Sequence, residues 1–378
     1  MTIKDELKKI KFIYNINAIV KAYKTKKKYK EIVRYYKGKK HHDIVFSPRE
    51  TSNVFYFGGD EYQDKSGFLQ GLEKNFEVEV FTQECGKYGQ YPRKDKFCRK
   101  KNTERLAQLL KNAEEKNNIP DLLLMQTWAW AIDVEELIRL KNKYGFFIAN
   151  IGMDDRHSYT DLGCWDRGTY GLIPALDFVL TCAPECTEWF EKEGIKAFYF
   201  PEASHPDFYY PDPNIDKIYD VGFVGAKYGL REKLVNQLEK DGIKVTCYGN
   251  GWPNGRLPLS DTNKFFNQCK ILLGVGTIGH TTDFYALKLR DFDATMAGCV
   301  YVTHDNPDLH DLFEPDREIV LASNIKEFSE KVAMLLCNEN LQAEIRVTAR
   351  KRAERYHNYE VRFAKLKKVL NGEIDEIF

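Results

Sequence analysis

The 378-residue sequence lacks any run of 18 uninterrupted apolar residues, so no transmembrane helix is expected. Its N-terminus has no apolar segment followed by a small-residue cleavage site, which argues against a secretory signal. The nine cysteines are odd in number, and none of them belongs to a CxxC pair. We therefore expect reduced thiols in the cytoplasm, and neither a disulfide framework nor a metal site.

Charge of one sign is concentrated at the N-terminus, although the whole chain carries only +1. Residues 1–40 hold 14 basic and three acidic residues, an excess of +11 that leaves −10 for residues 41–378. The acidic part would repel phosphates, so nucleic acid is not expected as a partner. The chain therefore divides into a basic arm and an acidic body.

The basic arm, residues 1–45, is predicted to be helical. Residues 1–37 contain neither Gly nor Pro. Apolar side chains recur there at helical spacing, at Ile3, Leu7, Ile10 and Tyr14. A basic amphipathic helix can lie on an anionic membrane surface. The alternative is a helix that packs on its own body or on a partner subunit.

Beyond residue 42, short β-rich runs alternate with helical stretches. Six runs come first and five follow: Val54–Phe57, Val78–Phe81, Leu122–Met125, Phe146–Ile151, Asp177–Thr181 and Ala197–Phe200, then Asp220–Val224, Lys244–Tyr248, Lys270–Val275, Val300–Thr303 and Glu318–Leu321. This alternation predicts an α/β protein with two Rossmann-like domains of parallel strands.

The proline-rich residues 201–214 mark the seam between these domains. We expect one domain over residues 46–205, a second over 206–356 and a closing helix over 357–378. Doubly wound domains bind ligands at the carboxyl ends of their strands, so the two sheets are expected to face a cleft.

Two loops of the second domain carry candidate ligand-binding residues. Gly225 lets the chain turn after its strand, and Lys227 and Arg231 can add positive charge where the next helix begins. The alternative is an ordinary turn with surface cations. In the next loop, Tyr248, Gly249 and Trp252 suit stacking on a base or ring.

A third loop matches the pattern GxGxxG at residues 274–279. This is the dinucleotide fingerprint, but it follows the third strand of its domain, and no acidic residue stands about 20 positions later. A nicotinamide-dependent enzyme is therefore a distant alternative. We expect Gly276 and Thr277 to let the backbone approach a ligand, and His280 to contact phosphate or sugar.

Residues 286–313 are predicted to form a helix, a buried strand and a turn. Lys288, Leu289 and Arg290 stand near the start of the helix, where cations can neutralise a diphosphate. Asp293 can accept two ribose hydroxyls, because a carboxylate only accepts hydrogen bonds. The alternative is an exposed helix laced with ion pairs.

The first domain carries a candidate acidic pair. Asp154 and Asp155 follow a predicted strand, and with His157 they are candidates for acceptor binding or for a general base. The alternative is a capping pair before a helix.

The run LKLRDFDATMAGCVYVTHDNPDLHDLFEPDREIV resembles the C-terminal signature of CgeB-like glycosyltransferases. This is a GT-B group related to the large retaining glycosyltransferase family. DVGFVGAKYGLREKLVNQL resembles the opening of the same domain, and CYGNGW resembles its YGxGW element. The resemblance is strongest over residues 219–371.

The resemblance implies a GT-B hexosyltransferase of polysaccharide biosynthesis that uses a UDP- or GDP-linked sugar and no metal. Its acceptor would be a glycan, a lipid-linked compound or a protein. Asp293 stands where such enzymes usually carry the Glu that binds the ribose. Related retaining enzymes have a second Glu where this chain has Tyr285, so retention of configuration stays open. The alternative is a non-catalytic nucleotide-sugar-binding or membrane-docked module.

Overall fold

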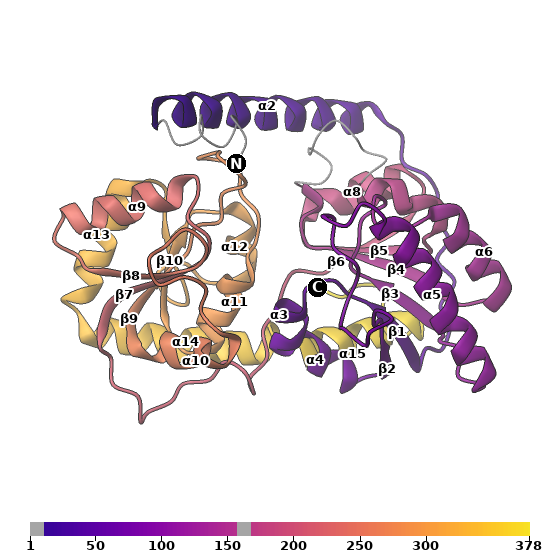
Figure 1. Ribbon diagram of the computed structural model, residues 1–378. Coiled ribbons are helices and arrows are strands. Elements are labelled where there is room, and N and C mark those ends of the chain that lie inside the picture. Colours follow the sequence, from indigo (N-terminus) through magenta and orange to yellow (C-terminus); the bar gives the residue numbers. More distant parts are fainter. Residues whose placement is uncertain (1–10, 157–167) are drawn as a thin grey trace. The chain divides into compact units, whose positions relative to one another are not determined.

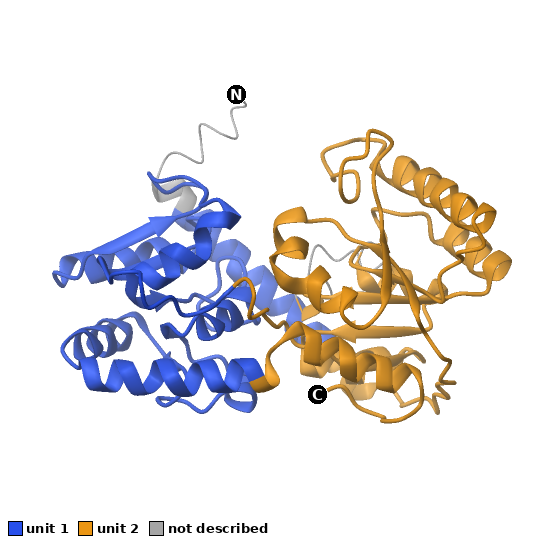
Figure 2. Ribbon diagram, turned by 90° about the horizontal axis from the view of Figure 1, so that it is seen from below, with its two compact units in different colours: residues 1–33, 209–354 blue, residues 34–208, 355–378 orange. Residues whose placement is uncertain are grey.

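The computed structural model describes residues 11–156 and 168–378, and the chain divides into two compact units (Figure 2). Unit 1 comprises residues 1–33 and 209–354. Unit 2 comprises residues 34–208 and 355–378.

Unit 2 is built on six parallel strands in the order β2-β1-β3-β4-β5-β6. The strands are β1 (Asn53–Phe57), β2 (Glu77–Val80), β3 (Leu122–Met125), β4 (Phe147–Gly152), β5 (Phe178–Thr181) and β6 (Lys196–Tyr199). The helices are α3 (Glu61–Gln63), a π-helical turn (Asp64–Phe68), α4 (Leu69–Glu73), α5 (Cys98–Glu115), α6 (Val134–Tyr144), a 3-10 helix (Thr169–Ala175), α8 (Pro184–Lys192) and α15 (Tyr359–Leu370). In Figure 1, α8 lies on one side of this sheet and α4 and α15 on the other.

Unit 1 is built on five parallel strands in the order β11-β10-β9-β7-β8. The strands are β7 (Tyr219–Val224), β8 (Val245–Tyr248), β9 (Cys269–Leu273), β10 (Val300–His304) and β11 (Val320–Ala322). The helices are α9 (Leu230–Lys240), α10 (Leu259–Gln268), α11 (Leu289–Met296), α12 (Pro307–Leu312), α13 (Ile325–Leu336) and α14 (Glu339–Tyr356). In Figure 1, α9 and α13 lie on one side of the sheet and α10 and α14 on the other.

Burial on both sides explains the composition of the strands. Every residue of β3 and every residue of β10 is buried, as in parallel sheets that are covered on both faces.

Local sequence signals determine where helices begin and end, as α6 shows. Asp133 accepts hydrogen bonds from the N–H groups of Glu135 and Glu136 and so caps the start of α6, and Gly145 ends this helix at a φ of +76°.

The predicted α/β class and both parallel sheets are confirmed. All eleven predicted strands are present, with ends that differ from the prediction by up to two residues.

The arm forms α2 (Lys11–Gly38), which packs along one stripe on its own chain. In unit 1 the rings of Tyr29 and Phe284 are 4.6 Å apart. In unit 2 Tyr36 stacks on Trp189 at 5.2 Å. This is the alternative that the sequence left open, while Ile3, Leu7 and Ile10 lie outside the described residues.

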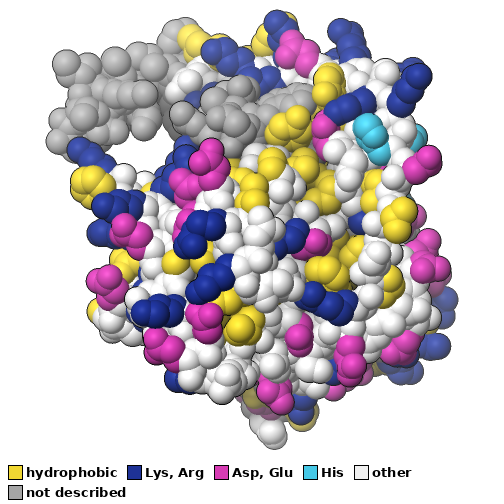
Figure 3. All heavy atoms as spheres, turned by 90° about the vertical axis from the view of Figure 1, so that its right-hand side faces the viewer, with side chains coloured by type: hydrophobic (Ala, Val, Ile, Leu, Met, Phe, Trp, Pro, Cys, Tyr) yellow, Lys and Arg dark blue, Asp and Glu magenta, His cyan; other side chains and the backbone are white. Residues whose placement is uncertain are grey.

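No described helix is both long and apolar enough to cross a membrane. On the side of the molecule where α6 lies, basic and acidic side chains are interspersed (Figure 3). The acidic excess of the body is therefore not gathered into one patch on that side.

Candidate anion-binding site

The candidate site lies at the carboxyl edge of the sheet in unit 1. Because the strands are parallel, β7, β8, β9 and β10 end on this same edge. Ligands of open α/β sheets bind beyond the carboxyl ends of the strands. The structure brings the thirteen expected donor-binding residues to this edge, since they lie at the end of β8, in the loops after these strands or near the starts of α9 and α11.

Glycine allows the first two loops of this edge to touch. Gly249 has a φ of +134°, and a Cβ atom there would lie 2.2 Å from the carbonyl oxygen of Gly225. Trp252 donates a 2.9 Å hydrogen bond from Nε1 to the same oxygen. The N–H of Lys227 donates to the carbonyl of Asn250 at 2.8 Å. The two loops therefore form one braced surface.

The aromatic residues of the second loop brace this surface from within the protein. Trp252 is only 8% exposed and packs edge-on against Phe223 at 6.1 Å. Tyr248 packs edge-on against Phe265 at 4.9 Å. The ammonium of Lys227 lies 5.0 Å from the Trp252 ring. Trp252, expected to stack on a base, is thus largely covered by its own chain.

Arg231, which is buried, and Arg290, which is half-buried, meet at Gly225. Arg290, in the first turn of α11, donates from Nη1 to the carbonyl of Val224. Arg231, in the first turn of α9, donates from Nη1 to the carbonyl of Ala226 at 2.9 Å. A Cβ atom on Gly225 would lie 3.0 Å from the Arg290 Nη1 and 3.3 Å from the Arg231 Nη1. Glycine therefore keeps open the space that both guanidinium groups border.

The charge of this pair is not compensated by any residue that the structure describes. Among the described residues, no carboxylate forms an ion pair with Arg231 or Arg290. The Nε of Arg231 and the Nε and Nη2 of Arg290 are shielded from water and have no hydrogen-bond partner. Burial, and then the charge of Arg290, lowers the pKa of Arg231 to about 10. Two like charges with unused donors, at the starts of two helices, are suited to bind an anion.

The start of α11 is held by an internal cap. The N–H of Lys288 donates to Asp291 Oδ2 at 2.8 Å, and the Tyr301 hydroxyl donates to Asp291 Oδ1 at 2.7 Å. Asp291 is therefore a structural residue whose pKa is raised by burial. Leu289 is half-buried, and Asp293 is buried one turn after Arg290.

The glycine-rich loop folds back on itself after β9. Thr277 pairs with Tyr285 in an antiparallel bridge and is buried. Gly276 is buried at the base of this hairpin, and His280 is half-buried near its tip. Burial, and then the charge of Lys21, lowers the pKa of His280 and so favours the neutral imidazole.

In unit 2 the acidic pair splits into two environments. Asp155 is buried, and its Oδ1 accepts a 2.6 Å hydrogen bond from the Thr169 hydroxyl. Its carboxylate folds back over Gly152, where a Cβ atom would lie 1.8 Å from Oδ2. Asp154 is exposed. His157 lies outside the described residues.

A buried carboxylate in unit 2 was not expected from the sequence. Asp64 is fully buried and accepts hydrogen bonds from Tyr56 Oη at 3.0 Å and Tyr88 Oη at 2.7 Å. Burial raises its pKa to about 6. The run Gly58-Gly59-Asp60, directly after β1, was the available signal for a special loop here.

A buried histidine in unit 1 was also missed. His304 ends β10 on the same edge as the arginines, is 1% exposed, and neither ring nitrogen has a hydrogen-bond partner. Burial lowers its pKa to about 4, so it is neutral. Its only sequence signal was the position at the end of a strand.

Among the residues that the structure describes, no group of three or more His, Cys, Asp or Glu side chains could hold a metal ion. The groups that the site presents to a ligand are cations and backbone N–H donors. It is therefore suited to phosphate oxygens.

Comparison with known proteins places this site in context. Residues 231–368 match a family model described as glycosyl transferase-like. This match includes both arginines and Asp293. No curated protein matches the chain.

Solved structures share the architecture at low sequence identity. A sucrose-phosphate synthase from Thermosynechococcus elongatus aligns with a TM-score of 0.59 and 10% identity, over 85% of this chain and 100% of that chain. HepE from Anabaena, solved with UDP and glucose, aligns with a TM-score of 0.55 and 11% identity, over 86% of this chain and 98% of that one.

A protein from Listeria monocytogenes described as a UDP-N-acetylglucosamine 2-epimerase aligns with a TM-score of 0.55 and 12% identity, over 87% of this chain and 100% of that one. At these identities the likeness shows the fold and not the reaction. The chain thus has the GT-B fold of two Rossmann-like units, and its C-terminal part matches a glycosyl transferase-like family.

Proposed function

We propose that the protein is a glycosyltransferase that transfers a hexose from a nucleotide sugar. The observation that carries this proposal is the pair Arg231 and Arg290 at the carboxyl edge of unit 1, two cations whose guanidinium groups keep shielded donors without a hydrogen-bond partner among the described residues. Such a pair is destabilising unless an anion joins it. The match of residues 231–368 to a glycosyl transferase-like family supports a nucleotide sugar as that anion.

Unit 1 would hold the donor. The diphosphate would take its hydrogen bonds from the two guanidinium groups and from N–H groups at the starts of α9 and α11, with Lys227 and Lys288 beside them. Asp293 would accept the ribose hydroxyls, as the resemblance to CgeB-like enzymes implies. UDP is the first nucleotide to test, because HepE was solved with UDP-glucose.

The reaction breaks the bond between the anomeric carbon and the diphosphate oxygen, and the acceptor hydroxyl oxygen forms the new bond to that carbon. Positive charge grows on the sugar while negative charge grows on the diphosphate. The two arginines would stabilise the departing diphosphate without a metal. We propose retention of configuration, in which the departing phosphate oxygen takes the acceptor proton.

Residues 46–205 would bind the acceptor, a glycan, a lipid-linked compound or a protein, and residues 206–356 the donor. Asp154 is the exposed carboxylate of the expected acidic pair and is our candidate for an acceptor contact. We further propose that residues 1–40 place the protein at an anionic, cytoplasmic membrane face, where polysaccharide precursors are carried on lipids.

The test is incubation with UDP- and GDP-sugars, followed by NMR of the products. Wild type should release the nucleoside diphosphate and move the sugar to an acceptor, whereas Arg290→Gln should do neither and Arg317→Gln, an exposed control, should match wild type. A change of configuration at sugar C2 would instead show an epimerase. Nucleotide-sugar binding without turnover would show a non-catalytic module.

A further inference from the structure

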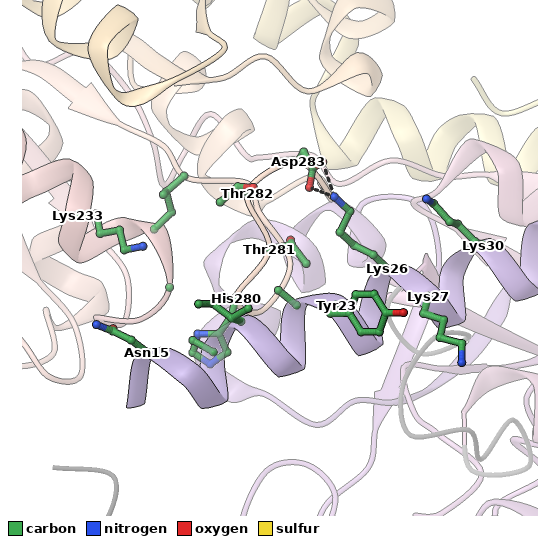
Figure 4. A pocket seen from close by; sticks show the side chains of 15 residues that line it. Asn15, Tyr23, Lys26, Lys27, Lys30, Lys233, His280, Thr281, Thr282 and Asp283 are labelled. Atoms are coloured by element: carbon green, nitrogen blue, oxygen red, sulfur yellow. Dashed lines mark hydrogen bonds and ion pairs between the residues drawn. The ribbon is translucent and has the colours of Figure 1, made fainter. Parts of the chain in front are cut away.

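A second cationic site lies under α2 within unit 1. A pocket of about 760 Å³ opens between α2, the first turn of α9 and the tip of the hairpin that follows β9 (Figure 4). Four lysines and one carboxylate line it, namely Lys26, Lys27, Lys30, Lys233 and Asp283.

Cations outnumber carboxylates in this pocket. Lys26 is neutralised by Asp283, with 2.6 Å between Nζ and Oδ2. Lys27 makes only a long, exposed contact with Glu31 at 3.9 Å. Lys30 and Lys233 form no ion pair with any described residue. An anion that enters would therefore meet an excess of positive charge from two helices.

Apolar side chains stand exposed beside these lysines. On α2, Ile19 is 69% and Tyr23 is 68% exposed, and both line the pocket. Ile16 and Val20, one turn away, are 47% and 43% exposed. Clustered exposed apolar side chains among lysines are typical of a helix that lies on lipid.

These apolar residues are not needed to hold α2 in place. The opposite stripe of the helix anchors it, since Tyr29 packs on Phe284 and Ile32 is 3% exposed. The ion pair of Lys26 with Asp283 adds a polar anchor at the same level. The helix is thus fixed by one face and presents apolar and basic side chains on another.

We propose that this pocket binds the phosphate headgroup of an anionic membrane lipid, with Ile19 and Tyr23 entering the lipid layer beside it. This proposal rests on the membrane role of residues 1–40 proposed above, and it names the site and the ligand. Arg231 and Arg290 do not line the pocket, although His280 does, so the lipid site and the two-arginine site can be tested with separate variants.

The first experiment uses monomeric short-chain lipid and the full chain. Dihexanoyl-phosphatidylglycerol, below its micellar concentration, should bind saturably, and at least tenfold more tightly than dihexanoyl-phosphatidylcholine or inorganic phosphate. Lys30→Gln/Lys233→Gln should weaken this binding at least tenfold. The matched control Lys24→Gln/Lys326→Gln removes the same charge from α2 and from α13, outside the pocket, and should bind as wild type does.

Several outcomes would overturn the proposal. Equal binding by the pocket variant and wild type would show that the pocket is not the site. Equal affinity for inorganic phosphate and the lipid would show a site for soluble phosphate compounds. Equal affinity for the two lipids would show that the headgroup charge is not recognised.

A second experiment tests the apolar side chains and distinguishes lipid binding from nucleotide binding. Sedimentation with phosphatidylglycerol vesicles should fall at least fivefold for Ile19→Ser/Tyr23→Ser. The affinity of this variant for glycerol 1-phosphate, which is the headgroup without its acyl chains, should equal that of wild type. Undiminished sedimentation of this variant would overturn the role of the apolar pair. UDP should raise the Tm of Lys30→Gln/Lys233→Gln and of Ile19→Ser/Tyr23→Ser as much as it raises that of wild type. A failure of the lipid proposal is thereby distinguished from a failure of the proposed donor site.

Discussion

Arg231→Gln should stabilise the protein and at the same time strongly reduce its thermal response to a nucleotide. The pKa of Arg231 falls from 12.5 to about 10 on folding, with burial as the largest cause and the charge of Arg290 next. At about 1.4 kcal/mol per pKa unit, the charged form costs about 3 kcal/mol in the folded state at neutral pH. The side chain is only 7% exposed, so water screens this cost little.

The substitution also removes favourable contacts. The hydrogen bond to the Ala226 carbonyl contributes about 1 kcal/mol, and the packing of the guanidinium on the Tyr228 ring at 4.2 Å contributes about another 1 kcal/mol. The net gain in the free energy of unfolding is then about 1 kcal/mol. For a unit of this size that raises the Tm by about 2–4 °C.

The nucleotide response should change in the opposite direction. Loss of a charge-assisted hydrogen bond to the diphosphate costs about 2–3 kcal/mol of binding, or about 30–150-fold in Kd. UDP at 100 times the wild-type Kd stabilises wild type by about 2.7 kcal/mol, and the variant should then gain less than about 1 kcal/mol.

Differential scanning fluorimetry with and without UDP measures both effects. Arg317→Gln, which removes an exposed guanidinium, should change neither the Tm nor the response. A variant that melts lower than wild type and responds to UDP as wild type does would refute the reasoning, because Arg231 would then be a structural cation.

Four further outcomes are expected. As the pH rises from 4 to 7, Asp64→Asn should become more stable than wild type by about 3 kcal/mol in urea unfolding. The carboxyl group of wild type has a pKa of about 6 in the folded state and 3.8 in the unfolded state. The stabilisation that its protonated form gives wild type below pH 3.8 is therefore lost as the pH rises to about 6, whereas the amide of the variant does not titrate. Gly249→Ala should lower the Tm and weaken UDP binding in calorimetry, because the new Cβ atom would clash with the carbonyl oxygen of Gly225. The control Gly242→Ala, whose Cβ atom would have no neighbour within 4 Å, should bind UDP as wild type does. Asp293→Ala should weaken binding of UDP but not of inorganic pyrophosphate, because only UDP carries the ribose. Deleting residues 1–40 should abolish sedimentation with anionic vesicles and leave the UDP response of the remaining chain in place, as fluorimetry would show.

The strands of this fold could be predicted from the sequence because each is a short apolar run bounded by turns. Leu122–Met125 needs no other part of the chain to identify it, and its observed bounds equal the predicted ones. Gly225, placed directly after such a run, followed from the same local pattern. Local sequence patterns were therefore sufficient to predict both sheets and the edge at which the candidate site lies.

The roles of individual side chains depended on partners far away in the sequence. Arg231 and Arg290 are 59 positions apart, and only the folded chain shows that both border Gly225. Trp252 looked available for stacking, but its indole is occupied by the Gly225 carbonyl and the Phe223 ring. The glycines before Asp64 indicated a special loop but not the burial of its carboxylate, because one of its two tyrosine partners, Tyr88, follows it by 24 positions.

In the arm, too, the sequence did not show which side chains the rest of the chain would cover. Its lysines and apolar residues suggested one amphipathic face, but α2 carries apolar side chains on two faces. Tyr29 and Ile32 face the body while Ile19 and Tyr23 stay exposed. Spacing alone could not show which of these faces the protein itself would cover.

The most direct test of the central claim is calorimetric titration of the full chain with UDP. The two-arginine site predicts one UDP bound per wild-type chain, and no measurable binding by Arg231→Gln/Arg290→Gln at the same concentrations. Binding of UDP by this double variant with the wild-type affinity would contradict the account, as would the absence of binding of any nucleoside diphosphate to wild type.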